Sequence, residues 1–201
     1  MAGLPDVVKA RVEKKLRAIL YVAELGSTGL SDSTWDEKER SVAGFTFIDV
    51  LRTDMKANAW ATAKEASPFK PDAEHALTVE IEDAEGDTRT NAIQYILLHE
   101  FGHILTVGEP LLPPWDVPIT TRTRAKEHPF FALTWSVTPK GALSSRHDAV
   151  FAGLPGPIRF SHQSESELPA SVMADVYARL SSTTFVTLYG ATNPHDDFAE
   201  A

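Results

Sequence analysis

The sequence predicts an α+β fold, with a small mixed sheet in the first half of the chain and mostly helices and loops in the second. Three observations support this prediction. Residues 77–82 alternate between apolar and polar side chains, which is typical of a strand with one solvated face. Residues 91–107 carry apolar side chains at helical spacing. Ten of the 13 prolines lie at or beyond Pro110, so the second half should be rich in loops.

The segments of the first half are expected to be helices and strands bounded by glycine, proline or a turn. In chain order we predict a helix over residues 5–25, a strand over 42–51, a helix over 55–66, a strand over 75–83 and a turn over 84–87. The strand over 75–83 should lie at the edge of the sheet, above the helix that follows it. That helix should begin at a cap among Asp87, Thr88 and Thr90 and end near Val107.

The second half is expected to hold short elements joined by proline-rich loops. The predicted segments are a connector over residues 109–118, a strand over 128–137, a loop over 152–160, a helix over 168–180 and a short helix that starts at Pro194 behind an Asn193 cap.

Composition excludes several classes of function. The formal net charge is −9 and no cluster of Lys and Arg stands out, so we expect no nucleic-acid partner. The chain has no Cys, which excludes disulfides and thiolate metal sites. No stretch approaches the ~20 apolar residues of a membrane span, and residues 1–10 do not resemble a signal peptide, so we expect neither in this chain. The compartment and the oligomeric state stay open.

The chemistry of the chain is concentrated in His-Glu-Phe-Gly-His, residues 99–103, within the predicted helix. His99 and His103 are four residues apart and share one helical face, where two neutral imidazoles can reach one zinc ion at ~2.0–2.1 Å. Glu100 lies about 100° around the helix, where it can reach a water on the metal but not comfortably the metal itself. The sequence therefore predicts one Zn²⁺ per chain with Glu100 as general base. The alternative is a helix with two hydrogen-bonded core histidines.

A catalytic zinc usually takes a third protein ligand, and the sequence offers it near the C-terminus. The layout that extends the motif by Gly-x-x-His is rejected, because Glu109 stands where its histidine would be. Asp196 and Glu200 are four apart on the predicted last helix, so one can bind the metal and the other can support a ligand histidine. The local rivals of Asp196 as ligand are His195 and Asp197.

Together, HEFGH and the downstream segment YGATNPHDDFAEA resemble the protease domain of the anthrax-toxin lethal factor and its bacterial relatives, in the gluzincin group of zincins. In that family a tyrosine and a Glu-Phe-Phe-Ala-Glu segment close the site. The resemblance implies that Tyr189 is the catalytic tyrosine, Asp196 the third ligand and Glu200 the supporting acid. Here an Asp stands at the ligand position. The resemblance also implies one zincin-like catalytic domain over residues 1–201, with an N-terminal lobe of residues 1–109 and a C-terminal lobe of residues 110–201.

The function expected from these residues is zinc-dependent endopeptidase activity on a peptide or protein substrate. Zinc would activate a water, Glu100 would take its proton, and Tyr189 would help to stabilise the oxygen that becomes negative. The predicted edge strand, at Thr78, Val79 and Glu80, would hold the substrate by strand addition. Two alternatives stay open: a zinc-bearing interaction or sensor domain that does not cut, and a zinc amidase that acts on a non-peptide bond.

Overall fold

The structure, a computed structural model, describes residues 4–115, 117–160 and 166–201 and has an α+β fold with small sheets. The chain packs as two units, each made of two stretches: Met1–Arg52 with Ile96–Ser144, and Thr53–Tyr95 with Ser145–Ala201. This division does not coincide with the lobe boundary expected at residue 109. Among the described residues, none of the helices combines the length and the apolarity that a membrane span requires.

The elements are short, apart from one long helix. In chain order they are α1 (Asp6–Lys15), β1 (Leu16–Val22), β2 (Gly29–Trp35), β3 (Ser41–Asp49), α2 (Ala57–Ala66), β4 (Phe69–Lys70), α3 (Arg89–Thr106), η1 (Ala125–Glu127), α4 (Phe131–Thr134), β5 (Trp135–Val137), β6 (Leu143–Ser145), η2 (Asp148–Phe151), β7 (Leu168–Pro169), η3 (Ala170–Val172), α5 (Met173–Leu180), η4 (Gly190–Thr192) and α6 (Pro194–Glu200).

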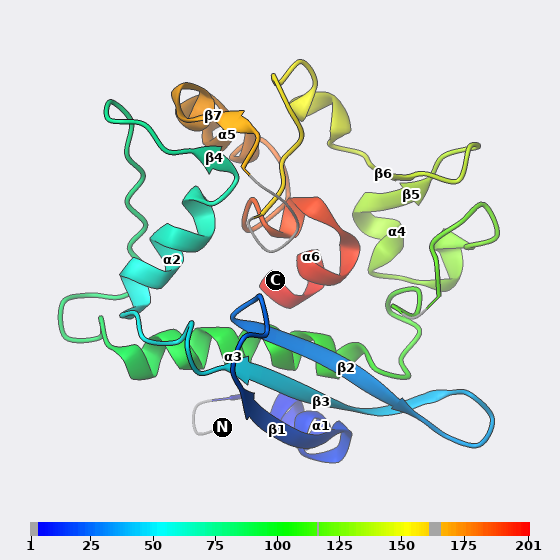
Figure 1. The fold of residues 1–201 in the computed structure, drawn as a ribbon. Coiled ribbons are helices and arrows are strands. Elements are labelled where there is room, and N and C mark those ends of the chain that lie inside the picture. The colour runs from blue at the N-terminus through cyan, green and yellow to red at the C-terminus, as the bar shows by residue number, and fades with distance from the viewer. Residues whose placement is uncertain (1–3, 116, 161–165) are drawn as a thin grey trace. The chain divides into compact units, whose positions relative to one another are not determined.

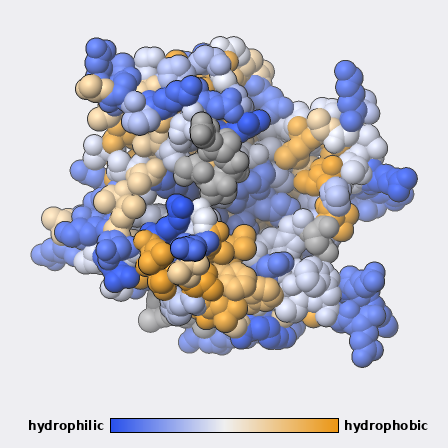
Figure 2. All heavy atoms as spheres, viewed as in Figure 1, coloured by the Kyte–Doolittle hydropathy of each residue, from blue (hydrophilic) through white to orange (hydrophobic). Residues whose placement is uncertain are grey.

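The main sheet belongs to the first unit and has the strand order β1-β3-β2, with β1 parallel and β2 antiparallel to β3 (Figure 1). One face of the sheet packs on α3: a Cβ built on Gly44 would lie 2.5 Å from Ile104, so only glycine allows this approach. Figure 2 shows apolar side chains gathered where the sheet meets the surface. Leu20 and Leu30, which both pair with Phe47 on the sheet, are 41% and 48% exposed.

The helix predicted over residues 5–25 is wrong in its second half, because it ends at Lys15 and β1 follows at once. Residues 16–22 pair with the central strand β3 in a parallel register, from Leu16 opposite Gly44 to Val22 opposite Asp49. The helical spacing of their apolar side chains is therefore overridden by a ladder of backbone hydrogen bonds to a distant segment, a contact that local pattern does not reveal.

The edge strand predicted over residues 75–83 is also wrong, because this segment is irregular and pairs with no strand. Its alternation is real: Val79 is half-buried between exposed Thr78 and Glu80. The hydroxyl of Thr62 on α2 bonds both the N–H and the C=O of Val79, at 2.9 and 3.3 Å. The backbone of Val79 is already engaged, so the assignment of Thr78, Val79 and Glu80 to substrate binding loses its basis. The two edge strands of the main sheet are instead β1 and β2, and the sequence predicted neither.

Other predicted segments are confirmed in whole or in part. The strand over 42–51 is β3 and the helix over 55–66 is α2, each within two residues at either end. The hydroxyl of Thr88 accepts the N–H of Asn91 at 3.1 Å and so caps α3, as the prediction allowed. The predicted strand over 128–137 is half wrong, because α4 occupies its middle and only β5 is extended. The last helix, α6, begins at Pro194 as predicted.

A buried lysine ties the first helix to the end of α3 within the first unit. Lys15 Nζ donates to the carbonyls of Leu105 and Val107, at 3.1 and 2.6 Å, and to Glu109 Oε1 at 2.7 Å. Its side chain is 10% exposed. A cation at the C-terminus of a helix satisfies carbonyls that have no helical partner. Glu109, which occupies the position of the missing histidine, is thus part of a structural ion pair.

We expect Lys15→Met to lower the free energy of unfolding by about 2–3 kcal/mol, because it leaves buried carbonyls and a carboxylate without their donor. Lys14→Met is the matched control, since Lys14 is exposed and should change stability by less than about 0.5 kcal/mol. Urea unfolding of the three proteins measures both values. Equal stability of the two variants would contradict a role for Lys15 in holding the end of α3.

Candidate metal centre

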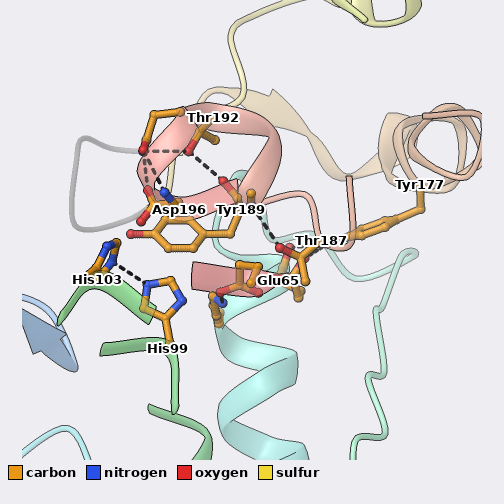
Figure 3. A network of polar contacts seen from close by, with 12 residues as sticks. Glu65, His99, His103, Tyr177, Thr187, Tyr189, Thr192 and Asp196 are labelled. Carbon is orange, nitrogen blue, oxygen red and sulfur yellow. Dashed lines mark hydrogen bonds and ion pairs between the residues drawn. The ribbon is translucent and has the colours of Figure 1, made fainter. Parts of the chain in front are cut away.

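The two histidines lie on the part of α3 that belongs to the first unit, and a nitrogen of each ring points toward the other ring (Figure 3). The Nε2 atoms of His99 and His103 are 3.1 Å apart, and the ring centroids are 4.8 Å apart. Without a metal this contact is a hydrogen bond in which one imidazole donates. Two nitrogens bound to one ion at ~2.0–2.1 Å with a near-tetrahedral angle lie about 3.3 Å apart. The pair therefore fits a shared metal ion through Nε2 without a change of helix geometry.

Glu100 is buried, with 4% exposure, and its carboxylate is held by the edge strand β2. Ser31 Oγ donates to Glu100 Oε2 at 2.7 Å and also lies 2.9 Å from Thr46 Oγ1. A Cβ at Gly29 would come within 2.4 Å of Glu100 Oε1, so glycine at this position leaves room for the carboxylate. A buried acid with a fixed hydrogen bond has one orientation, which suits a general base.

An aromatic residue flanks the histidines in the same unit. The Trp115 ring lies 5.7 Å from the His103 ring, centroid to centroid, and its indole N–H donates to Ser33 Oγ on β2 at 3.3 Å. An apolar wall beside an imidazole limits the access of water to it and lowers the local dielectric. Two serines of β2 thus bond residues next to the histidines: Ser31 bonds Glu100, and Ser33 bonds Trp115.

The predicted third ligand lies in the first turn of α6, in the second unit. Asp196 is 7% exposed, and the side-chain amide of Asn193 donates to its Oδ2. Asn193 Oδ1 accepts the N–H groups of His195 and Asp196, both at 2.9 Å, as a helix cap does. Asp197 is as buried as Asp196. Burial lowers the pKa of the His195 imidazole, although the negative charge of Asp196 acts in the opposite direction. All three candidates therefore occupy one short, well-fixed turn.

Tyr189 and Glu200, also in the second unit, share a partner that sequence reasoning missed. Lys64, in the last turn of α2, lies 2.6 Å from Glu200 Oε1 and 4.6 Å from the centroid of the Tyr189 ring. Phe160 packs edge-to-face on the same ring, with centroids 4.8 Å apart. Nothing in the pattern around residue 64 indicated this role, because the three residues are distant in sequence. The support of a ligand histidine by Glu200 stays a prediction.

His99, Glu100 and His103 lie in the first unit, and Tyr189, Asp196 and Glu200 lie in the second. Each of His99, His103 and Asp196 offers one ligand atom, and together they are a set that could hold a metal ion. Sequence reasoning also missed Ser31, because the polar, glycine-containing segment around it lacked the apolar alternation of a strand.

A second buried acid lies on α2 and makes stability sensitive to pH. Burial raises the pKa of Glu65 above its ordinary value of 4.5, although its neighbour Lys64 opposes this. Tyr177 donates to Glu65 Oε2 at 2.9 Å, and burial keeps this phenol protonated by raising its pKa (Figure 3). The unfolded chain releases the Glu65 proton near pH 4.5, and the folded protein releases it at a higher pH. The contribution of protonated Glu65 to stability is therefore complete below pH 4.5, and it is lost as pH rises through the pKa of Glu65 in the folded protein.

We expect Glu65→Gln to remove this contribution, since the amide keeps an acceptor for Tyr177 but does not ionise. Wild type should lose stability relative to the variant as pH rises from 4.5 toward neutrality. Urea unfolding at a series of pH values measures the difference, and Glu80→Gln at an exposed site controls for the loss of a charge. A constant difference between wild type and Glu65→Gln at all pH values would show that Glu65 has an ordinary pKa.

Comparisons with protein-family models, with curated proteins and with solved structures give no match to this chain.

Proposed function

We propose that this chain is a zinc-dependent endopeptidase in which His99, His103 and Asp196 hold one zinc ion and Glu100 is the general base. The observation that carries the proposal is local to α3: two imidazole nitrogens lie 3.1 Å apart, and the residue after the first histidine is a buried carboxylate fixed by a serine. Two imidazoles and one carboxylate are a donor set typical of catalytic zinc, which keeps a further position open.

The chemistry follows from these residues. A zinc ion held by this set would polarise the substrate carbonyl and lower the pKa of a water ligand. Glu100 would accept a proton from the attacking water and pass it to the leaving nitrogen. The hydroxyl of Tyr189 would donate a hydrogen bond to the carbonyl oxygen as negative charge develops there. Ser31 would keep the Glu100 carboxylate in one orientation throughout, which limits the reorganisation that proton transfer requires.

The position of β2 favours a peptide substrate over other amides. Within the described part of the chain, β2 pairs with β3 alone in its sheet, so one of its edges has no strand partner. Ser31 on this strand contacts the proposed general base directly. An extended peptide that added to β2 would gain backbone hydrogen bonds next to Glu100. β2 therefore replaces residues 78–80 as the proposed substrate-binding strand.

Two features of the structure weigh against the two other candidate functions. A zinc-bearing interaction domain needs the histidines but has no chemical use for a buried, serine-bonded Glu100. A zinc amidase would use the same residues but would have no use for the open edge of β2. We therefore rank both below the endopeptidase.

A cleavage profile separates the three functions. Zinc-loaded protein is incubated with a library of unstructured peptides, and the products are identified by mass spectrometry. The endopeptidase predicts internal cleavages that disappear when zinc is removed by a chelator and return when zinc is restored. One bound zinc per chain without any cleavage would favour the interaction domain, and hydrolysis of small amides alone would favour the amidase.

A further inference from the structure

Lys64 connects two of the proposed site residues through one ammonium group. Its Nζ forms an ion pair with Glu200 Oε1 at 2.6 Å and lies over the ring of Tyr189, 4.6 Å from the centroid. All three residues belong to the second unit, although 136 positions separate Lys64 from Glu200. The side chains of Lys64 and Glu200 are only 20% and 10% exposed, so this pair is largely shielded from water.

Lys64 Nζ also lies 5.6 Å from the centroid of the Trp60 ring. Its contacts with Glu200 and Tyr189 depend on each other. A cation is attracted to an aromatic face within about 6 Å of the ring centroid, and more strongly when water is excluded. The ion pair with Glu200 fixes Nζ in space, and a fixed cation then favours one orientation of the Tyr189 ring. Phe160, which is 2% exposed, packs edge-to-face against the same ring. The Tyr189 ring therefore has an apolar contact with Phe160 and an electrostatic contact with Lys64.

We propose that Lys64 is a positioning residue, which sets the orientation of the Tyr189 ring and links it to Glu200. Its effect on hydrolysis rests on the proposed function, because it acts through the tyrosine that would stabilise the reacting oxygen. Its effect on the ring does not depend on that function. The competing explanation is an ion pair that only joins α2 to α6. Such a pair would affect stability but would leave the ring environment of the folded protein unchanged.

A measurement on the ring decides between the two explanations without any substrate. The chain has four tyrosines, so protein with ¹³C-labelled tyrosine rings gives a simple NMR spectrum, and Tyr189→Phe identifies the Tyr189 signal. Lys64→Met keeps the length of the side chain but removes the charge, and it should shift the Tyr189 signal while leaving that of Tyr21 unchanged. Lys64→Arg keeps the cation and should restore the wild-type position. Lys70→Met, at an exposed site on β4, should shift neither signal.

An unchanged Tyr189 signal in folded Lys64→Met protein would overturn the proposal. So would a signal that Lys64→Arg fails to restore, because a change in packing would then explain the shift. If Lys64→Met does not fold, Lys64→Gln gives the same comparison.

The kinetic consequence is tested with the zinc-loaded protein and a peptide that it cleaves. Lys64→Met should lower kcat about tenfold with little change in KM, a part of the ~10²–10³ that loss of an oxyanion donor costs. In a Tyr189→Phe background the same substitution should have no further effect, because the group it positions is gone. Additive losses would contradict the proposal. A wild type that cleaves nothing would instead refute the proposed function, and the NMR result would still decide the role of Lys64.

Discussion

Glu100→Gln is expected to abolish hydrolysis while leaving zinc bound at one ion per chain. Glutamine keeps the size of the side chain and an oxygen that can accept the Ser31 hydroxyl, but it does not take up a proton from water. Loss of general acid–base catalysis should lower kcat by at least ~10²–10⁴. Peptide cleavage rates and metal analysis of the same protein samples measure both parts of this prediction.

Two further variants make the result specific. Glu85→Gln removes an exposed carboxylate and should cleave at the wild-type rate. Ser31→Ala removes the hydrogen bond but not the base, so its loss of kcat should be smaller than that of Glu100→Gln. Zinc-loaded Glu100→Gln that still cleaves within a few-fold of wild type would show that another group accepts the proton.

The second large expected effect is the loss of zinc affinity when the third zinc ligand is removed. Asp196→Ala should weaken zinc binding by more than the ~10–100-fold that the loss of an outer hydrogen-bond partner costs. His195→Ala should change zinc affinity by only a few-fold, although burial lowers the pKa of His195 and favours its neutral, ligand-competent form. Competition with a chromogenic chelator measures these affinities at fixed pH.

Asp197 supplies a matched control for this prediction. It is the next residue on α6, has the same 7% exposure and carries the same charge. Asp197→Ala should therefore reproduce any loss of helix stability or of local negative charge without a large loss of zinc. A larger loss in His195→Ala or Asp197→Ala than in Asp196→Ala would move the ligand to that residue.

The elements that the sequence predicted well are those whose signals are local. α3 is a long amphipathic helix with a hydroxyl cap at Thr88, and α6 begins with an Asn193 cap followed by Pro194. β1 and β2 were missed because their stability comes from pairing with β3, and the side-chain pattern within each strand does not reveal this pairing. Residues 75–83 show the opposite error, because a strand was predicted where the structure has none. Their alternation reflects packing against α2, and the hydroxyl of Thr62 takes the place of a neighbouring strand.

The candidate site divides in the same way. The spacing of His99 and His103 on one helix is enough to predict that their nitrogens approach each other, because helix geometry is fixed. Ser31, which contacts Glu100, and Lys64, which contacts Tyr189, come from segments 69 and 125 residues away in the chain. Such contacts depend on the tertiary fold, and no spacing rule in a single sequence points to them.

The most direct test of the account is the environment of the metal itself. X-ray absorption at the zinc edge of the purified protein, compared with His99→Ala and Asp196→Ala, reports the ligands of the bound ion. We predict one zinc per chain with two imidazole nitrogens and one carboxylate oxygen at ~2.0–2.2 Å, and the loss of one of these ligands in each variant. A protein that binds no zinc, or a zinc environment without histidine, would contradict the account.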